Sequence, residues 1–494
     1  MNDNEIQAII NRVMKEVGEA PASPAPAAAA RPKATDYGAD YGYGRSAEPA
    51  NPGSNGIYPT LDEAVAAAKG AFRRLDKLPL DIRKHMVDQM RRAGRENATI
   101  LAEMACSETG MGRVEDKVLK NILNADKTLG PEALETRAWS GDDGLTITEY
   151  APYGVIGALT PSTNPTSTII CNAIAMVAAG NAVVFNAHPS AKGASNHTIQ
   201  ILNQAIMRAG GPPDLLTCVA APTIESAQAL MRHKDIRLLT VTGGTPVVRA
   251  AMQSGKRAVC AGPGNPPVVV DETANIEQAG RDVVIGGSFD NNIVCTTEKE
   301  TFAVDGICDE LIQVMTHHGA VQLNQWQFNR LWKAVIVKDR GPRKYADMNK
   351  ALIGKNASVL LAEIGISAGP EVRMIVAEVE QDHPAVWSEQ MMPLMPVVRV
   401  SSADEGIDLA VEAEHGFQHT AVMHSKNLDN LSRMAREINC SIFVKNGPNL
   451  AGLGYGGEGY CSFTIASPTG EGLTGPRSFS RRRRCTLVDA FRIV

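Results

Sequence analysis

From residue 154 to residue 186 the chain reads GVIGALTPSTNPTSTIICNAIAMVAAGNAVVFN. Its two ends, 154–160 and 181–186, are short apolar runs bounded by glycine, proline and asparagine, which predicts two strands. The segment between them, 165–179, predicts a helix, because apolar side chains recur on one helical face. These side chains are Ile169, Ile170, Ala173, Ile174 and Val177. A strand, a helix and a second strand form a β-α-β unit, which predicts a parallel sheet.

The same alternation continues on both sides of this unit. Further strands are predicted downstream, with helical segments between them (215–219, 236–242, 266–270 and 300–304). Three helices are predicted upstream (61–72, 79–104 and 115–129). The pattern favours a largely parallel, doubly wound α/β fold, in which ligands bind beyond the carboxyl ends of the strands.

Four predicted strand ends carry residues that suit a binding site. Loops at 161–165, 187–190 and 243–245 follow three of the strands, and the fourth strand precedes segment 288–299 with Cys295. The loop at 243–245 opens a predicted helix, whose backbone amides suit a phosphate group. Because it lacks the G-x-G-x-x-G pattern, a plain tight turn is the alternative.

Cys295 is expected in a loop between a helix and a strand, among amide and hydroxyl side chains. Such a loop can present a thiol to a cleft while the scaffold holds it in place. For an arbitrary cysteine, a half-buried structural role is the commoner one. The local sequence alone does not decide between the two roles.

Composition and charge restrict the class of protein. A chain of 494 residues is expected to hold two or three domains, and 44% hydrophobic with 21% charged residues is ordinary for a large soluble α/β protein. The net charge of −5 argues against a nucleic-acid-binding protein. The basic run at 481–484 is expected at a solvated or subunit-interface edge, with a phosphate-bearing ligand as the less favoured alternative.

The cysteines and histidines predict neither a disulfide framework nor a metal site. Nine cysteines are scattered without a C-x-x-C pair, which favours a reducing cytosol, and ten histidines lack metal-ligand spacing. The most apolar segment, 168–184, is interrupted by asparagine and glycine. It is therefore expected to be a buried helix leading into a strand, with no membrane span.

Residues 1–18 predict a separate amphipathic helix, and residues 19–56 predict a disordered linker. One apolar stripe runs along the helix (Ile6, Ile9, Ile10, Val13, Met14 and Val17). The linker is rich in Pro-Ala and Tyr-Gly pairs and has almost no core-forming residues. A short tethered helix must dock elsewhere to cover its apolar face, and a docking tag is favoured over a subunit-swapped arm.

Three motifs occur in the order found in one known family. Ser162-Thr163-Asn164-Pro165 follows a strand, Thr242-Gly243-Gly244-Thr245 follows another, and Cys295 follows a helix and a loop. From residue 57 to its C-terminus the chain resembles the aldehyde dehydrogenase superfamily. The resemblance implies an aldehyde dehydrogenase-like α/β fold with two doubly wound parallel-sheet domains, one for the cofactor and one catalytic, plus a small oligomerisation β-element.

The resemblance also implies domain boundaries. The cofactor-binding domain is expected at 57–261, with 144–153 contributing to the oligomerisation hairpin. The catalytic domain is expected at 262–445. Residues 446–494 are expected to return to the cofactor domain and to supply an oligomerisation strand, so that the protein forms dimers or tetramers.

One departure from the family pattern concerns the second half of the reaction. Hydrolytic members carry a glutamate in a Glu-Leu-Gly-Gly-Lys-x-Pro segment, where it activates water. The corresponding stretch here, 261–267, reads AGPGNPP, with Ala261 in place of that glutamate. Because an acyl-enzyme without a general base hydrolyses slowly, a thiol can be the productive acceptor. This form of the segment resembles the CoA-acylating branch of the superfamily.

Within that branch, the chain looks most like the enzymes of propanediol-utilisation bacterial microcompartments, and nearly as much like those of the ethanolamine pathway. The motifs that carry this likeness are at 107–112, 161–165, 389–396, 419–421 and 443–448. They imply oxidation of propionaldehyde, with NAD and coenzyme A, to propanoyl-CoA in the lumen of a cytoplasmic microcompartment. Residues 1–18 resemble an encapsulation peptide that binds shell proteins. An acetaldehyde-specific enzyme is the alternative, and a hydrolytic enzyme or a non-catalytic shell-binding scaffold is less favoured.

The resemblance assigns roles to individual residues. Cys295 is the expected nucleophile, and the Asn164 side chain with the Cys295 backbone N–H is expected to hold the oxyanion. The expected cofactor-binding residues are Thr163, His188, Pro189, Gly243, Gly244, Thr245 and Glu389. A loop-shaping role is the alternative for Thr163, and the preference for NAD over NADP rests on the resemblance. His419 is a candidate partner for the CoA thiol, and a core histidine bonded to backbone is an equally favoured role.

Overall fold

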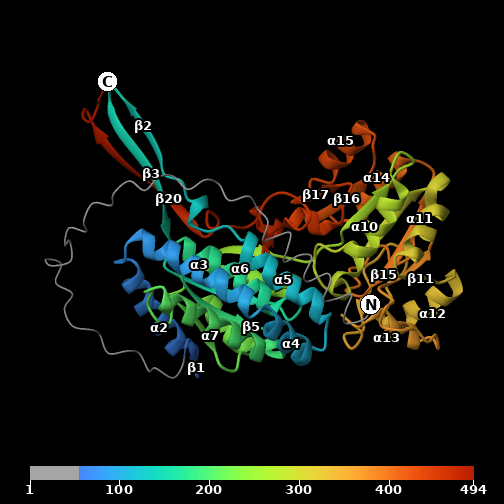
Figure 1. Ribbon diagram of the computed structural model, residues 1–494, viewed down its shortest axis with the longest axis horizontal. Coiled ribbons are helices and arrows are strands. Elements are labelled where there is room, and N and C mark those ends of the chain that lie inside the picture. Colours follow the sequence, from blue (N-terminus) through green and yellow to red (C-terminus); the bar gives the residue numbers. More distant parts are fainter. Residues whose placement is uncertain (1–54, 494) are drawn as a thin grey trace, which may run out of the picture. The chain divides into compact units, whose positions relative to one another are not determined.

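The computed structural model describes residues 55–493, which belong to one compact unit. The helix predicted at 1–18 and nearly all of the linker predicted at 19–56 lie outside the described residues. Figure 1 shows the elements that the following paragraphs name.

The first sheet has six parallel strands in the order β1-β6-β5-β4-β7-β8. They are β1 (Ile57–Tyr58), β4 (Val155–Thr160), β5 (Ala182–Ala187), β6 (Leu216–Val219), β7 (Leu238–Thr242) and β8 (Arg257–Ala261). Strands β4, β5 and β6 are buried along their whole length, as expected of a parallel sheet with both faces covered. The predicted β-α-β unit is confirmed, with α6 (Pro165–Ala178) between β4 and β5.

Helices pack around this sheet in two groups, which their mutual contacts define. Helices α3 to α7 contact one another, whereas α2 and α8 contact each other and strands β4 and β5. The bounds of these helices are α2 (Leu61–Leu75), α3 (Leu80–Glu96), α4 (Ala98–Thr109), α5 (Val114–Lys127), α7 (Lys192–Arg208) and α8 (Ile224–Arg232). A further helix, α9 (Thr245–Met252), connects β7 to β8.

The single helix predicted at 79–104 is two helices, α3 and α4. They are separated at Asn97, whose backbone leaves the helical region (φ −106°, ψ 9°). Its side chain donates a hydrogen bond to the Ala93 carbonyl, which closes the end of α3. Asparagine competes for backbone partners in this way, and an uninterrupted apolar pattern does not reveal it.

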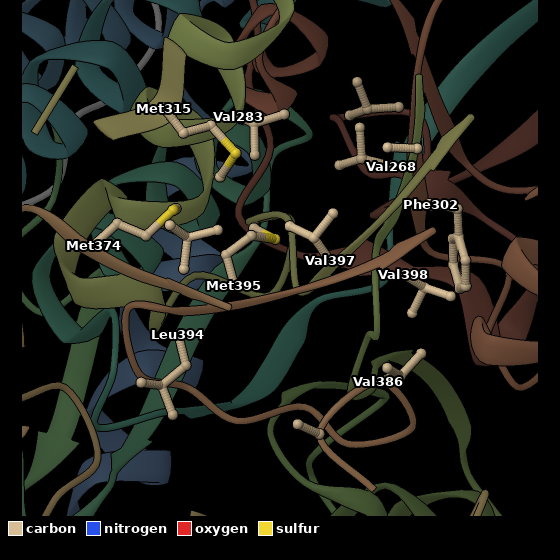
Figure 2. Packing of buried hydrophobic residues seen from close by; sticks show 14 of the residues in the cluster. Val268, Val283, Phe302, Met315, Met374, Val386, Leu394, Met395, Val397 and Val398 are labelled. Atoms are coloured by element: carbon tan, nitrogen blue, oxygen red, sulfur yellow. The ribbon is translucent and has the colours of Figure 1, made fainter. Parts of the chain in front are cut away.

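The second sheet has seven parallel strands in the order β11-β14-β15-β10-β9-β16-β17. They are β9 (Pro267–Val270), β10 (Glu300–Val304), β11 (Ala320–Gln322), β14 (Met374–Glu378), β15 (Leu394–Val400), β16 (Thr420–His424) and β17 (Ile442–Lys445). The helices that follow these strands include α10 (Ile276–Ser288), α11 (Asp305–His317), α12 (Gln325–Val335), α14 (Ala403–Ala413) and α15 (Leu428–Glu437). Figure 2 shows the core of this region, with Val283 of α10 and Met315 of α11 near Met395 and Val397 of β15.

A separate antiparallel sheet joins β2 (Arg137–Gly141), β3 (Gly144–Pro152) and β20 (Ser480–Val488). Strand β20 carries the basic run at 481–484, and all four arginines are exposed. The Arg484 guanidinium lies over the Trp139 ring at 5.9 Å from its centroid. Strand β3 pairs antiparallel with both β2 and β20 within one chain.

The apolar segment at 168–184 is a buried helix that leads into β5, as the sequence predicts. Within residues 55–493, no helix has both the length and the apolar character that crossing a membrane requires. All nine cysteines lie in this part of the chain and are free.

Candidate functional site

The two large sheets are linked by one short connection. Strand β8 ends the first sheet at Ala261, and β9 begins the second sheet at Pro267, so that residues 262–266 join them. Because the strands of each sheet are parallel, this connection leaves the carboxyl edge of the first sheet and enters the amino edge of the second. The loops of these two edges are therefore the place to look for a site.

The carboxyl edge of the first sheet gathers the loops that the sequence predicts to lie together. Strands β5, β4, β7 and β8 are neighbours in the sheet. They end just before His188, before the loop with Asn164, before Gly243 and at Ala261, respectively. The shared edge is thus confirmed for these loops.

The amino edge of the second sheet gathers the remaining candidates. Strands β15, β10, β9 and β16 are neighbours, and Glu389, Cys295, Gly264 and His419 lie in the segments that lead into them. The sequence led us to expect the Cys295 segment at the carboxyl end of the strand at 266–270, and this placement is wrong. Helix α10 carries the chain back across the sheet, so that Cys295 precedes β10 at the opposite edge.

An unusual backbone conformation precedes Cys295. Asp290, Asn291 and Asn292 have positive φ angles of 48°, 54° and 65°. Aspartate and asparagine tolerate this region best, and each such residue costs about 1–3 kcal/mol. The Asn291 amide donates to the Gly354 carbonyl at 2.8 Å, and the other two side chains are bonded as well. The loop that carries Cys295 is therefore fixed by its surroundings.

The residues after Cys295 are tied to the C-terminal part of the chain. The Thr296 hydroxyl donates to Asn449 Oδ1 at 2.9 Å. The Asn449 backbone N–H and side-chain amide in turn donate to the Glu298 carboxylate, the former at 2.8 Å. Burial raises the pKa of Glu298 to about 7, while these donors oppose the rise. Both sides of the cysteine are thus anchored.

The Cys295 thiol is half-buried among groups of both charges. Burial and, to a smaller extent, the Glu389 carboxylate raise its pKa, and Lys299 and Lys120 oppose the rise, so that the pKa lies at about 12. Lys299 is buried and donates to the Asn292 carbonyl at 2.7 Å and to Thr297 Oγ1 at 2.9 Å. Burial lowers the pKa of Lys299 to about 8. The two ammonium groups therefore favour the thiolate, which is the reactive form of cysteine.

Asn164 is held from α5. Its Oδ1 accepts a hydrogen bond from Lys120 Nζ at 2.6 Å, and its Nδ2 donates to Thr163 Oγ1 at 3.1 Å. Lys120 also contacts the Asp290 carboxylate, which accepts from Lys117 Nζ at 2.9 Å. The loop of Asn164, helix α5 and the loop of Cys295 are therefore joined by buried polar contacts.

Gly264 lies between the Cys295 loop and His419. A Cβ atom added to Gly264 would be 2.8 Å from the Cys295 carbonyl oxygen and 3.1 Å from His419 Cγ. The Gly264 backbone also hydrogen-bonds the buried Glu389 carboxylate, whose pKa burial raises. Glycine is needed here because these groups approach the backbone so closely.

His419 is fully buried. Its Nδ1 lies 2.9 Å from Thr420 Oγ1, and its Nε2 has no partner among the residues that the structure describes. Burial, together with the positive charge of Lys299, lowers the pKa of His419 to about 4. The ring is therefore neutral at physiological pH and retains one nitrogen for a further group.

The candidate cofactor residues at 188–189 and 244–245 lie at the surface, unlike the buried residues around Cys295. His188 and Pro189 lie at the surface, and His188 Nδ1 lies 2.7 Å from Ser190 Oγ. Partial desolvation of the ring, together with the charge of Lys350, lowers the pKa of His188.

Gly244 is the N-cap of α9 and provides no side-chain cap, while Thr245 is the exposed first residue of that helix. The Gly244 and Thr245 N–H groups are the ones that remain for a phosphate group, because Pro246 has no N–H and the Val247 N–H donates to the Gly244 carbonyl at 3.2 Å. A Cβ on Gly244 would have its nearest neighbour at 3.8 Å.

Sequence reasoning did not find the buried charged residues of the site: Lys117, Lys120, Asp290 and Lys299. One signal was present in α5. Its polar residues Lys117, Lys120, Asn121 and Asn124 recur at helical spacing on a buried face. When such a polar stripe lies on the buried face of a helix, its side chains must find partners inside the protein. The stripe therefore indicates an internal hydrogen-bond network.

Comparison with known proteins now identifies the family. The model of the aldehyde dehydrogenase family matches residues 55–463. The chain belongs to the aldehyde dehydrogenase family. It is 49% identical over 440 residues to the acetylating acetaldehyde dehydrogenase EutE of Salmonella typhimurium, covering 89% of this chain and 94% of the relative. It is 44% identical to the CoA-propanoylating propanal dehydrogenase of the same organism, covering 90% and 95% of the two chains.

Solved structures of family members have the same fold. The propionaldehyde dehydrogenase of Rhodopseudomonas palustris, solved with bound CoA and an acylated cysteine, is 46% identical with a TM-score of 0.85, and the match covers 88% of this chain and 99% of that one. A propionaldehyde dehydrogenase from the fucose-utilisation bacterial microcompartment of Clostridium phytofermentans is 45% identical with a TM-score of 0.86. That match covers 89% of this chain and 100% of the other. The aldehyde dehydrogenase fold expected from the sequence is confirmed.

Proposed function

We propose that this family member is a CoA-acylating aldehyde dehydrogenase that oxidises a short aldehyde with NAD and transfers the acyl group from Cys295 to coenzyme A. The observation that carries the proposal is Ala261. A buried methyl group ends β8 at the position where hydrolytic members carry the glutamate that activates water. Because a methyl group cannot accept a proton, a thioester on Cys295 persists until a thiol arrives.

The first half of the reaction uses the thiolate form of Cys295, which burial and Glu389 disfavour and two nearby lysines favour. Its sulfur attacks the aldehyde carbon as the thiolate, which Lys299 and Lys120 favour. The Asn164 amide and the Cys295 backbone N–H donate to the oxyanion, a contribution that is about 10²–10³-fold in rate per donor. The loops at 188–190 and 243–245, with Glu389, would hold NAD, which supplies a hydride acceptor when bound.

The second half needs a thiol to lose its proton next to the thioester. The neutral His419 ring contacts the segment beside Cys295, and its Nε2 is available as the acceptor. The CoA sulfur then bonds to the acyl carbon, the Cys295 sulfur leaves as thiolate, and acyl-CoA is released. Sulfur serves here both as nucleophile and as leaving group, which explains a cysteine rather than a serine.

The proposed substrate is propionaldehyde, with acetaldehyde as the alternative. The likeness to the propanal dehydrogenase and to the two propionaldehyde dehydrogenase structures supports it. The similarity to the acetylating enzyme supports the alternative equally well. Rates with the two aldehydes at equal concentration decide between them.

We also propose that residues 1–18 direct the enzyme into the lumen of a bacterial microcompartment by binding shell proteins. The amphipathic pattern of this segment and the origin of the Clostridium relative support the idea. We further propose that residues 57–261 and 262–445 act as cofactor and catalytic domains, and that β3 and β20 pair subunits into dimers or tetramers. A chain lacking residues 1–18 should retain activity but no longer bind shell proteins.

The test of the proposed activity is a steady-state assay with propionaldehyde and NAD. NADH and propanoyl-CoA should form in equal amounts when CoA is present. Formation of free propanoate at the same rate with and without CoA would overturn the acylating function. The absence of any NADH formation would overturn the dehydrogenase function itself.

A further inference from the structure

Helix α5 buries two lysines against one aspartate. Lys117 and Lys120 are 2% and 1% exposed at their side chains, and both Nζ atoms contact the Asp290 carboxylate. Burying charged groups is costly unless they are paired, and here two ammonium groups share one carboxylate. The two lysines thereby connect helix α5 to the loop that carries Cys295, since Asp290 belongs to that loop. An arrangement of this cost points to a role beyond stability.

Lys120 differs from Lys117 in its further contact. Lys120 Nζ donates to the side-chain Oδ1 of Asn164 at 2.6 Å, whereas Lys117 Nζ donates to the backbone carbonyl of Thr163 at 3.2 Å. An ammonium group has donors only, so the oxygen of the Asn164 carboxamide must face Lys120. The amide nitrogen is thereby turned to the opposite side.

The Asn164 side chain is diverted from the role that its position in the helix favours. Asn164 is the N-cap of α6, where an asparagine oxygen ordinarily accepts from the backbone N–H groups of the first turn. Here the side chain makes no such cap. One N–H of its Nδ2 donates to Thr163 Oγ1, and the other N–H has no partner among residues 55–493. The free N–H is the one available for an oxyanion.

The same lysine acts on the nucleophile through its charge. Lys120 is among the groups that lower the pKa of the Cys295 thiol. Lys120 therefore contacts the oxyanion donor, and its charge also favours the thiolate form of Cys295.

We propose that Lys120 is the positioning residue of the oxyanion site: it fixes the orientation of the Asn164 carboxamide, so that one amide N–H faces the oxyanion. This inference rests on the proposed function, because it gives Asn164 the oxyanion role. It adds to that function a residue on a helix that no motif of the sequence singles out.

The test compares Lys120→Met with Lys117→Met, a matched control one helical turn away. Both variants remove a buried ammonium from Asp290, and only the first also releases Asn164 Oδ1. Lys120→Met should lower kcat for NADH formation about 100-fold, the size expected for loss of one oxyanion donor, with a much smaller change in the KM for NAD. Lys117→Met should lower kcat less than about tenfold. Equal losses in the two variants would overturn the proposal, because they would indicate a shared structural effect.

A double-mutant cycle separates positioning from general damage. In an Asn164→Ala background, Lys120→Met should lower kcat by less than about tenfold, because the carboxamide that Lys120 positions is gone and only its charge effect on Cys295 remains. A full 100-fold loss in that background would contradict the inference. If Lys120→Met does not fold, Lys120→Gln takes its place. It keeps an N–H donor for Asn164 and loses the charge, so it should retain more activity than Asn164→Ala.

The failure of the inference is distinguishable from failure of the proposed function. The unmodified enzyme is first assayed with propionaldehyde, NAD and CoA, and loss of the proposed function appears there as absent NADH or absent acyl-CoA. The variants are then compared by the rate at which iodoacetamide alkylates Cys295, which needs neither NAD nor CoA. Lys120→Met should slow this alkylation at pH 7.5 much less than it lowers kcat, because alkylation of the thiol uses no oxyanion donor. A loss in alkylation as large as the loss in kcat would overturn the positioning role.

Discussion

The two sheet edges that residues 262–266 connect differ in the residues that form them. The carboxyl edge of the first sheet presents loops with glycine, such as Gly243-Gly244, and exposed residues at the N-terminus of α9. The amino edge of the second sheet presents Cys295 among buried charged side chains, such as Lys299 and Glu389. The first edge suits a ligand that binds and leaves, and the second suits covalent chemistry in a protected, polarising environment. Variants on the two edges should therefore fail in different ways.

The largest effect is expected at the nucleophile. Cys295→Ser should reduce NADH and acyl-CoA formation by at least about 10⁴-fold, because a hydroxyl is neither as nucleophilic nor as good a leaving group. Cys440→Ser is the matched control, since Cys440 is another half-buried cysteine and its pKa is also raised to about 12 by burial. The Cys440→Ser control should keep nearly full activity. Comparable losses of activity in the two variants would show that replacing any half-buried cysteine impairs the enzyme, and would contradict the assignment of Cys295 as nucleophile.

The next effect is on stability. Asp290→Asn leaves Lys117 and Lys120 without their shared carboxylate, and should lower the free energy of unfolding by about 3–5 kcal/mol. Asp282→Asn is the control, because its partner Arg281 is about half exposed and the loss should stay below roughly 1 kcal/mol. Denaturation midpoints at one protein concentration measure both. A change in Asp290→Asn as small as that of the control would mean that the lysines find other partners.

The pH dependence of Cys295 alkylation sharpens the comparison further. Because the raised pKa leaves the group as a thiol at pH 7, the rate should rise about tenfold per pH unit between pH 6.5 and 7.5. The rise should flatten above pH 8, where Lys120 and Lys299 lose the charge that favours the thiolate. A rate that is already constant at pH 6.5 would mean that the thiol is ionised, contrary to the buried environment described here.

A smaller effect is expected where the connection passes between the edges. Gly264→Ala introduces a methyl group within 3.1 Å of both the Cys295 carbonyl and His419, so the loop must shift. The predicted loss in kcat is between about 10- and 100-fold. Gly306→Ala is the control, since an added Cβ there meets nothing within 4 Å. Unchanged kcat in Gly264→Ala would show that the loop position is not critical for reaction.

The smallest effect is expected on the cofactor edge. Gly244→Ala adds a methyl group that has room in the free protein but obstructs a phosphate at α9. The KM for NAD should rise about three- to tenfold, equivalent to roughly 0.7–1.4 kcal/mol, while the melting temperature stays unchanged. A fall in kcat at unchanged KM would mean that this edge contributes to chemistry instead of binding.

How far the sequence predicts the molecule also differs between the two edges. The strands that end at Thr160, Ala187 and Thr242 follow from apolar runs and glycine turns, and the cofactor-side loops could be placed in advance on a shared edge. The position of Cys295 at the start of β10 could not, because the pattern does not show on which edge a loop emerges after the helix that precedes it. The break of the long predicted helix at Asn97 was missed for a similar local reason.

The charged cluster was the least predictable part of the site. Lys117 and Lys120 lie on a helix far from Asp290 in sequence, and lysine is ordinarily found on the surface. Only the fold brings these residues to the loop of Cys295. The role of Ala261, by contrast, is visible in the sequence because it depends on a residue that is missing from a motif.

The most direct test of the account is a single-turnover measurement without CoA. Purified enzyme mixed with propionaldehyde and NAD should release one equivalent of NADH per Cys295 and then stop, because nothing at Ala261 activates water. Addition of CoA should restart turnover and produce propanoyl-CoA. Continued NADH formation without CoA, with propanoate accumulating at the same rate, would contradict the account and point to another water-activating group, such as Glu389.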